Sequence, residues 1–277
     1  MEYYQFKFEE VAAETIEQLI ALLDGIGFTG FEEEEGVLKA FINRSQFDEN
    51  QFDLVIQPLS VKYSQSTIQE ENWNAKWESG FEPVTVFHPV SGERFLHLRA
   101  SFHEPDPAAT HQIVITPKMS FGTGHHATTY LMAEQMSQLD IKGKSVFDFG
   151  TGTGVLAILA EKLGASKVIA VDNDEWSIRN AEENIAANHC EKIILKQVDH
   201  FPVVEKLPVI LANINLNVIV NNLPAIKQAS EKGAKILLSG IMNKDEEALE
   251  AALKQQNILV QQVFQKNEWS AILAISY

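Results

Sequence analysis

The second half of the chain alternates short apolar runs with helical patterns, and this alternation restricts the fold more than any other feature. Continuous apolar runs rich in Val and Ile occupy residues 145–150, 167–173, 192–199, 208–214 and 234–240. Helical patterns separate them at 155–164, 175–189, 217–230 and 244–257. Strands buried on both faces have such sequences. The alternation therefore predicts an α/β fold, with a parallel sheet covered by helices. Two last runs, 258–266 and 268–276, are joined by a tight connection, so we expect an antiparallel pair at the sheet edge.

The first part of the chain has a different order of elements. We predict strands over 3–8, 27–35, 37–43 and 61–69, with helices over 13–25 and 48–57. This order fits a small split β-α-β layer, an α+β domain of the ferredoxin-like kind. The predicted parts are this α+β domain at 1–62, a linker with a short helix at 63–80 and a large domain at 81–277.

The linker is polar apart from three aromatic residues. Trp73, Trp77 and Phe81 are spaced to line one face of a short helix. We interpret it as a connector that docks on the large domain, in preference to direct substrate contact. Further strands are expected over 83–87, 94–102 and 112–117, before a glycine-rich loop.

Charge and composition exclude several classes of partner. The formal net charge is -16. Nucleic-acid binding needs clustered Lys and Arg, so we expect no direct nucleic-acid binding and an attraction for basic partners. No apolar run approaches the ~18 residues of a membrane span and the first residues do not resemble a signal peptide, so we expect a cytoplasmic protein. The single cysteine, Cys190, excludes an internal disulfide and is interpreted as a small buried apolar residue.

Glycines follow the run at 145–150 in the sequence DFGTGTG. Gly150, Gly152 and Gly154 therefore fall at the carboxyl end of a strand, where doubly wound sheets bind ligands. Glycine permits a sharp turn and leaves the backbone open to a ligand. Asp172 ends the next strand, where a carboxylate accepts hydrogen bonds from ribose hydroxyls. Both nicotinamide and S-adenosylmethionine enzymes share these features, and a structural turn without a ligand remains an alternative.

Three features favour S-adenosylmethionine. Asp148 precedes the first glycine by two residues, where a carboxylate suits an ammonium group and repels a pyrophosphate. Asn213 ends the fourth strand, and its amide can accept hydrogen bonds from an amine. A buried asparagine in a turn is the alternative for Asn213. The antiparallel ending leaves no second nucleotide-binding half for a dinucleotide.

Asp174, just before a helical pattern, is predicted to be a helix N-cap.

These motifs resemble a known family. DFGTGTG with AVDND is similar to the class I S-adenosylmethionine-dependent methyltransferases. Together with SFGTGHHATT (120–129), NWNAKW (72–77), LANI (211–214) and EW (268–269), they resemble the methyltransferases of ribosomal protein L-eleven (L11). The resemblance implies a class I, Rossmann-like sheet and a first domain that holds the protein substrate. It also implies four cofactor-contacting positions, which are Thr129, Gly150, Asp172 and Asn213. Ala127 stands where proline is common in relatives.

Further site residues are predicted beside these four positions. We add Asp148 and Gly152 to the cofactor site, and Asp199 for the adenine amino group, with a plain strand-end carboxylate as the alternative for Asp199. Asn213 is the candidate catalytic residue. His125 and His126 are adjacent and lack a third ligand nearby, so we predict no metal site and a role in shaping the loop.

The expected function is N-methylation of lysine side chains, the N-terminal amine or both in ribosomal protein L11, by a monomeric enzyme. A neutral amine would attack the sulfonium methyl group in line, with catalysis mainly by positioning. The alternatives are a class I methyltransferase acting on another protein or a small amine, a non-catalytic cofactor-binding scaffold, and an NAD-dependent oxidoreductase.

Overall fold

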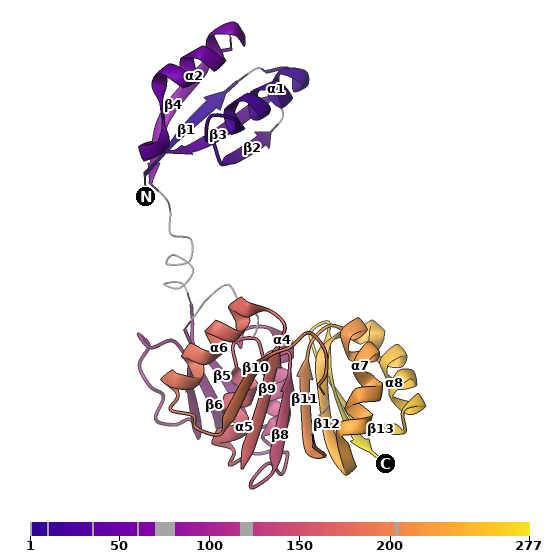
Figure 1. Ribbon diagram of the computed structural model, residues 1–277. Helices are drawn as coiled ribbons and strands as arrows, with labels where there is room; N and C mark the ends of the chain where they lie inside the picture. The colour runs from indigo at the N-terminus through magenta and orange to yellow at the C-terminus, as the bar shows by residue number, and fades with distance from the viewer. Residues whose placement is uncertain are drawn as a thin grey trace. The chain divides into compact units, whose positions relative to one another are not determined.

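The computed structural model describes residues 2–9, 11–34, 36–59, 61–69, 81–116, 124–202 and 205–277. The chain divides into two units, Met1–Lys76 and Trp77–Tyr277, which are described separately (Figure 1). The predicted linker helix, with Trp73 and Trp77, lies outside the described residues. So does most of the glycine-rich loop, at 117–123.

The first unit is a four-stranded antiparallel sheet with two helices, built from β1 (Glu2–Phe8), α1 (Ala13–Asp24), β2 (Gly30–Glu34), β3 (Val37–Asn43), α2 (Glu49–Ile56) and β4 (Tyr63–Gln69). The strand order is β2-β3-β1-β4. Alternate residues of β1 and β3, including Phe6, Phe8 and Leu38, are buried against the two helices. This arrangement confirms the ferredoxin-like prediction.

One predicted boundary is corrected by the strand pairing. β4 pairs with β1 along its whole length, from Tyr63 opposite Phe8 to Gln69 opposite Glu2. The first unit therefore extends beyond the predicted boundary after residue 62. An edge strand is held by backbone hydrogen bonds and leaves most of its side chains in solvent, so the polar sequence of β4 resembles that of a linker.

The second unit is a seven-stranded sheet covered by helices. Its core consists of β8 (Ser145–Phe149), α5 (Val155–Lys162), β9 (Lys167–Asp172), α6 (Glu175–Ala187), β10 (Ile193–Gln197), β11 (Leu207–Asn213), α7 (Leu216–Ala229), β12 (Ser230–Met242), α8 (Glu246–Gln255), β13 (Ile258–Lys266) and β14 (Trp269–Ser276). The strand order is β10-β9-β8-β11-β12-β14-β13. β14 runs antiparallel to both β12 and β13, which confirms the predicted pair. β13 lies outside β14 and forms the edge.

The sheet residues alternate between two hydrophobic cores. Val146, Val168 and Leu211 face a core that includes α5 and a further helix, α4 (Ala127–Met136). Phe147 and Ile210 face the opposite core, against α7 and α8. The central strands of the sheet are therefore buried on both faces, as their apolar sequences predict (Figure 1).

A three-stranded sheet precedes α4, formed by β5 (Val84–Phe87), β6 (Arg94–Arg99) and β7 (His111–Val114). β6 pairs antiparallel with β5 and parallel with β7. Phe81, the last aromatic residue of the predicted linker stripe, is buried in the core shared by this sheet, α4 and α5.

Candidate functional site

Three predicted polar residues lie at the carboxyl ends of adjacent strands of the large sheet. Asp172, Asp148 and Asn213 belong to β9, β8 and β11, which are neighbours in that order. Each lies an even number of residues after apolar residues that face α4 and α5, so all three side chains project toward the same face. From β8 the chain continues into β9 on one side of β8, whereas β11 lies on the other side of β8. Asp148 and Asn213 therefore flank the topological switch point, where sheets of this kind bind ligands.

The glycine turn between β8 and α5 is held by backbone hydrogen bonds. The N–H groups of Gly150 and Thr151 both donate to the Val171 carbonyl at 2.9 Å. Gly150 has a φ of +76°, and a Cβ atom there would lie 2.2 Å from Cγ2 of Ile214, the residue after Asn213. Glycine is therefore required at position 150 by the packing of the Asn213 loop as well as by the turn.

Asp172 connects this turn to the next helix. Its Oδ2 accepts the Gly152 N–H at 2.8 Å, and its Oδ1 accepts the Asp174 N–H at 3.1 Å. Asp174 in turn caps α6 by accepting the Ser177 N–H at 2.9 Å, which confirms the predicted N-cap. Asp172 is thus fixed at the mouth of the turn and is partly exposed.

Asp148 is fully buried beneath the same turn. Burial raises the pKa of its carboxyl to about 7, opposed by the hydrogen bond from Thr151, and the nearby Asp172 raises the pKa further. Oδ2 accepts the Thr151 hydroxyl at 2.6 Å. Oδ1 is buried and has no hydrogen-bond partner among the described residues. A buried carboxylate oxygen without a partner costs free energy, and a cationic group placed beside it would relieve that cost.

Asn213 is oriented by a residue that lies 84 positions earlier in the chain. Its Nδ2 donates to Oγ1 of Thr129, a buried residue in the first turn of α4, at 3.4 Å. Its Oδ1 is buried and has no hydrogen-bond partner in the described parts of the chain. Because one N–H of the amide nitrogen is directed to Thr129, the amide oxygen remains as an acceptor for a ligand. This contact brings two predicted residues together.

The two adjacent histidines have separate partners. His126 caps α4, where its Nδ1 lies 2.8 Å from the Thr128 hydroxyl, and its ring packs edge-on against Trp269. The ring of His125 packs edge-on against Phe81, with 4.8 Å between the ring centroids. Within the described residues no group of three His, Cys, Asp or Glu side chains is arranged to hold a metal ion.

Asp199 directly follows Val198, whose N–H donates to the Asp172 carbonyl at 2.8 Å. Asp199 follows β10, and its side chain is 85% exposed and hydrogen-bonded to His200. That hydrogen bond lowers the pKa of Asp199. Cys190 is half-buried, and burial raises the pKa of its thiol to about 11, so it is a poor nucleophile. None of the helices described is both long and apolar enough to cross a membrane.

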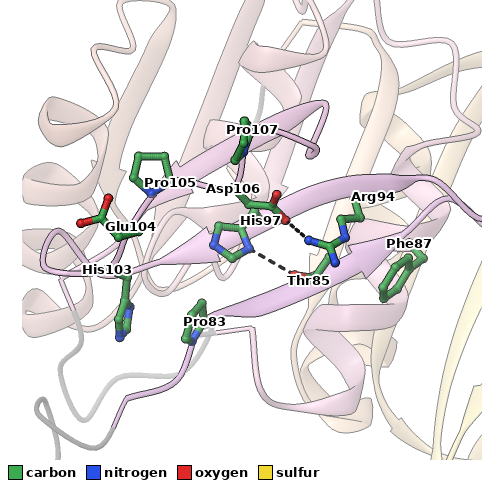
Figure 2. Close-up of a pocket in the computed structure, with 10 residues that line it drawn as sticks. All are labelled: Pro83, Thr85, Phe87, Arg94, His97, His103, Glu104, Pro105, Asp106 and Pro107. Atoms are coloured by element: carbon green, nitrogen blue, oxygen red, sulfur yellow. Dashed lines mark hydrogen bonds and ion pairs between the residues drawn. The ribbon is translucent and has the colours of Figure 1, made fainter.

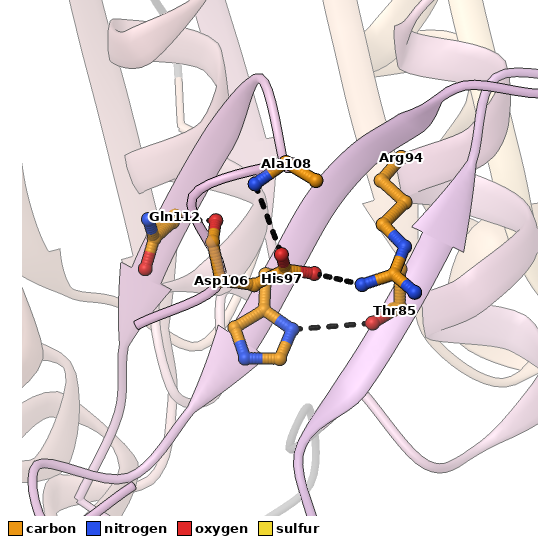
Figure 3. Close-up of polar contacts among 6 residues, drawn as sticks. All are labelled: Thr85, Arg94, His97, Asp106, Ala108 and Gln112. Atoms are coloured by element: carbon orange, nitrogen blue, oxygen red, sulfur yellow. Dashed lines mark hydrogen bonds and ion pairs between the residues drawn. The ribbon is translucent and has the colours of Figure 1, made fainter. Parts of the chain in front are cut away.

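A separate pocket of about 490 Å³ lies on the three-stranded sheet (Figure 2). Its polar side chains largely pair with one another. Arg94 and Asp106 form an ion pair at 2.6 Å, and His97 Nδ1 lies 3.1 Å from the Thr85 hydroxyl (Figure 3). Asp106 also accepts the Ala108 N–H. None of the predicted site residues lines this pocket, so we do not assign the chemistry to it.

Two contributors to the site were not predicted. Thr151 was absent from the predicted set, although its place between two glycines marks it as part of the turn. Thr128 was also absent, and it joins His126 at the start of α4. Both are threonines. The role of each depends on which residue its hydroxyl hydrogen-bonds, and the sequence alone does not identify that residue.

Comparison with known proteins places this chain in a family. The family model described as Ribosomal protein L11 methyltransferase (PrmA) matches residues 8–276. The chain belongs to this family. A Ribosomal protein L11 methyltransferase of Bacteroides thetaiotaomicron is 35% identical over 281 residues, which cover 98% of this chain and 99% of the relative. One from Chlorobaculum tepidum is 36% identical over 276 residues, covering 95% and 93%.

A solved structure agrees with these sequence relatives. The crystal structure of a ribosomal protein L11 methylase from Lactobacillus delbrueckii subsp. bulgaricus superposes with a TM-score of 0.61 at 27% identity. It covers 66% of this chain and 95% of that one. As a member of the family the chain is a class I methyltransferase, and its cofactor is S-adenosylmethionine.

Proposed function

We propose that this chain methylates ribosomal protein L11, the substrate that the names of its relatives give for those proteins, and that the groups it methylates are amines. The observation that carries the proposal is the pair of buried oxygens, Asp148 Oδ1 and Asn213 Oδ1, at the switch point of the sheet, neither of which has a hydrogen-bond partner among the residues that the structure describes. Both are acceptors, so they fit a cofactor with cationic groups and a substrate with N–H groups. When bound, S-adenosylmethionine supplies a methyl group on a positively charged sulfur.

The turn and its neighbours supply the rest of the cofactor site. Asp172 has two carboxylate oxygens with lone pairs beyond those used by Gly152 and Asp174, and these would accept the ribose hydroxyls. Gly150 and Gly152 would keep the backbone open to the ligand. Asp199 would accept the adenine amino group after releasing His200, since the exposed side chain is not held by the core.

Asp148 would contribute a negative charge to the cofactor site. Its position beneath the turn suits the ammonium end of the cofactor, because the buried carboxylate has one oxygen committed to Thr151 and one available. A cation beside it would lower the raised pKa of this carboxyl and favour the ionised form. A pyrophosphate in the same place would be repelled, which argues against the oxidoreductase alternative.

Asn213 would orient the substrate amine. The Thr129 hydroxyl fixes the Asn213 amide, so that Oδ1 accepts an N–H hydrogen bond and directs the nitrogen lone pair away from itself. No described side chain at these strand ends is a strong base in this arrangement, and positioning of a neutral amine accounts for the catalysis. A protonated substrate amine would lose one proton to solvent before the attack. The nitrogen–carbon bond would then form as the carbon–sulfur bond breaks, and the positive charge would pass from the sulfur to the methylated amine.

The first unit would hold the protein substrate. Residues 1–69 contain thirteen acidic and four basic residues, a net charge of -9 that accounts for more than half of the charge of the chain. Ribosomal proteins are typically basic, so the electrostatic attraction favours encounter. We assign the reaction to the cytoplasm and the amines to lysine side chains, the N-terminal amine or both.

The test is methyl transfer from labelled S-adenosylmethionine to total ribosomal protein. We expect label in the L11 band, and loss of that label with the Asn213→Ala variant. Label in another ribosomal protein, or only in a small-molecule fraction, would favour the alternative of a different protein or small amine. Binding of S-adenosylmethionine without transfer to any fraction would favour the scaffold alternative.

A further inference from the structure

Three buried asparagines follow one face of α6 at intervals of one helical turn. Asn180 and Asn184 have no exposed surface, and Asn188, at the C-cap, is 9% exposed. Asparagine is a weak helix former, and a buried amide destabilises the fold unless its donors and acceptors are paired. Each of these buried amides therefore needs hydrogen-bond partners, and an apolar side chain at the same position could not pair with them.

Two of these asparagines pair with the edge of β7. Asn188 Oδ1 accepts the Val114 N–H at 2.9 Å, and Asn188 Nδ2 donates to the Val114 carbonyl at 2.6 Å. Two residues further along the chain, the Thr116 N–H donates to Asn184 Oδ1 at 2.7 Å. The amides therefore take the place of a neighbouring strand. This pairing joins β7 to α6. By itself it indicates a structural role for the two asparagines.

Besides a contact with Asn180 Oδ1 at 3.4 Å, Asn184 makes a hydrogen bond to the glycine turn that Asn188 does not make. Its Nδ2 donates to the carbonyl of Thr153 at 2.8 Å. Thr153 is buried in the glycine turn, between Gly152, whose N–H donates to Asp172, and Gly154, the N-cap of α5. One amide thus joins the end of the three-stranded sheet to the turn.

Asn184 can hydrogen-bond to Thr153 because the two helices α5 and α6 approach each other closely. A Cβ atom at Gly154 would lie 3.3 Å from Cβ of Ala181. The absence of a side chain at Gly154 and the small side chain at Ala181 bring the start of α5 against α6. The Thr153 carbonyl then comes within hydrogen-bond distance of Asn184, one turn further along α6.

We propose that Asn184 is a positioning residue that fixes the glycine turn for cofactor binding. The Thr116 N–H orients its amide, and the amide nitrogen then holds the Thr153 carbonyl, so the neighbouring Gly152 stays bonded to Asp172. A turn held in its binding conformation loses less entropy when the ligand binds. The inference rests on the proposed assignment of this turn to the cofactor.

The test compares two alanine variants on the same helix face. Both Asn184→Ala and Asn188→Ala remove hydrogen bonds to the same segment and should lower the thermal unfolding midpoint. We expect Asn184→Ala to raise the Kd for S-adenosylmethionine by roughly tenfold or more, and Asn188→Ala to change it by less than about twofold. Calorimetry gives the Kd, and hydrogen exchange should show faster exchange of the Gly152 and Gly154 amides in Asn184→Ala only.

Should Asn184→Ala fail to fold, Asn184→Asp supplies the same comparison. It keeps an acceptor for the Thr116 N–H and replaces the donor to the Thr153 carbonyl. An unchanged Kd in a destabilised Asn184 variant, or equal losses of affinity in the Asn184 and Asn188 variants, would overturn the proposal and leave the cofactor assignment intact. Failure of the wild-type protein to bind S-adenosylmethionine would overturn both.

Discussion

The Thr151 hydroxyl donates to Asp148 Oδ2 across 2.6 Å, and this bond is made entirely inside the protein. It leaves the second carboxylate oxygen buried without a partner in the described structure. Burial opposes ionisation of Asp148, whereas a cationic ligand favours it. Binding of S-adenosylmethionine and ionisation of Asp148 are therefore expected to be linked.

The first prediction concerns the pH dependence of cofactor affinity. Protonation of Asp148 removes the charge that attracts the cation, so the Kd for S-adenosylmethionine should rise as pH falls below about 7, by at most about tenfold per pH unit. Calorimetry between about pH 6 and about pH 8.5, in buffers of different ionisation enthalpy, measures both the Kd and the proton release. The isosteric variant Asp148→Asn should bind weakly, with a Kd that does not vary through this ionisation. A flat wild-type profile would exclude this linkage.

The second prediction is that the Asp148 carboxyl lowers the free energy of unfolding of the ligand-free protein at high pH. The folded-state pKa of Asp148 is raised above its ordinary value, so the folded protein binds the proton more tightly and stability is lost as pH rises from about 4 to about 7. A shift of this size is equivalent to about 4 kcal/mol, which is an upper estimate of the gain in free energy of unfolding for Asp148→Asn at about pH 8.

Urea unfolding of the wild type and Asp148→Asn across pH tests this. The two proteins should converge near about pH 4, where both side chains are neutral. Burial lowers the pKa of His97, His111 and His126, so these residues destabilise both proteins as pH falls below about 6.5. Because the histidines are common to both proteins, the difference between the curves isolates Asp148. A variant no more stable than the wild type at alkaline pH would contradict the prediction.

The third prediction separates Asp172 from its neighbour. Asp172→Ala removes the proposed ribose acceptor and the bond to the Gly152 N–H, so it should weaken S-adenosylmethionine binding by roughly 1.5–3 kcal/mol. Asp174→Ala removes only the cap of α6 and should reduce stability by about 1 kcal/mol with little effect on the Kd. Calorimetry and thermal unfolding of both variants provide the measurement. Similar Kd values for wild type and Asp172→Ala would remove Asp172 from the cofactor site.

The sequence predicts the centre of the large sheet well because the central strands are buried on both faces. β8, β9 and β11 are nearly continuous apolar runs, so the polar residues at their carboxyl ends, such as Asp148 and Asn213, are visible at once. The helix α4 was not predicted, since eight of its ten residues are buried and no polar face marks it as a helix. The predicted boundary after residue 62 cuts through the strand predicted over 61–69 for the opposite reason, because the side chains of β4 are mostly exposed and resemble those of a linker.

The contacts that orient the site could not be predicted. The distance from Asn213 to Thr129, and the pairing of Thr151 with Asp148, depend on how α4 and the glycine turn pack. Gly150 illustrates the same limit. The sequence assigns it to the ligand, whereas the structure also requires it for the packing of Ile214.

The fourth prediction tests the division of labour between the units. A protein that starts at Trp77 lacks the acidic first unit and retains both cores of the large sheet. It should bind S-adenosylmethionine with the wild-type Kd, and its KM for intact L11 should rise by about tenfold or more, because the electrostatic and docking contributions are lost. Steady-state kinetics on intact L11 provides the measurement, with a short lysine peptide as control. Wild-type kinetics of the shortened protein on L11 would show that the first unit does not hold the substrate.

The fifth prediction joins Asn213 to the chemical step. If its Oδ1 orients a neutral amine, Asn213→Ala should slow methyl transfer by about 10²–10³, as expected when one well-placed polar contact in a transition state is removed. The Kd for S-adenosylmethionine should change much less. Thr129→Val keeps the size of the side chain and removes the acceptor for Asn213 Nδ2, so it should show a smaller loss in the same step. Single-turnover methyl transfer with saturating cofactor measures both variants.

The substrate amine gives an independent test of the same mechanism. A lysine has a reference pKa near about 10.4, so only about one molecule in a thousand is neutral near pH 7.4, which is equivalent to roughly 4 kcal/mol. Its methylation should speed up about tenfold per pH unit until the pKa of the bound lysine is reached. An α-amine, with a pKa near about 7.7–8.0, should level off near pH 8. Substrates that retain only the lysines or only the free N-terminus separate the two curves. A flat lysine curve from about pH 6.5 to about pH 9.5, together with a wild-type rate for Asn213→Ala, would exclude the neutral-amine mechanism and leave Asn213 as a buried turn residue.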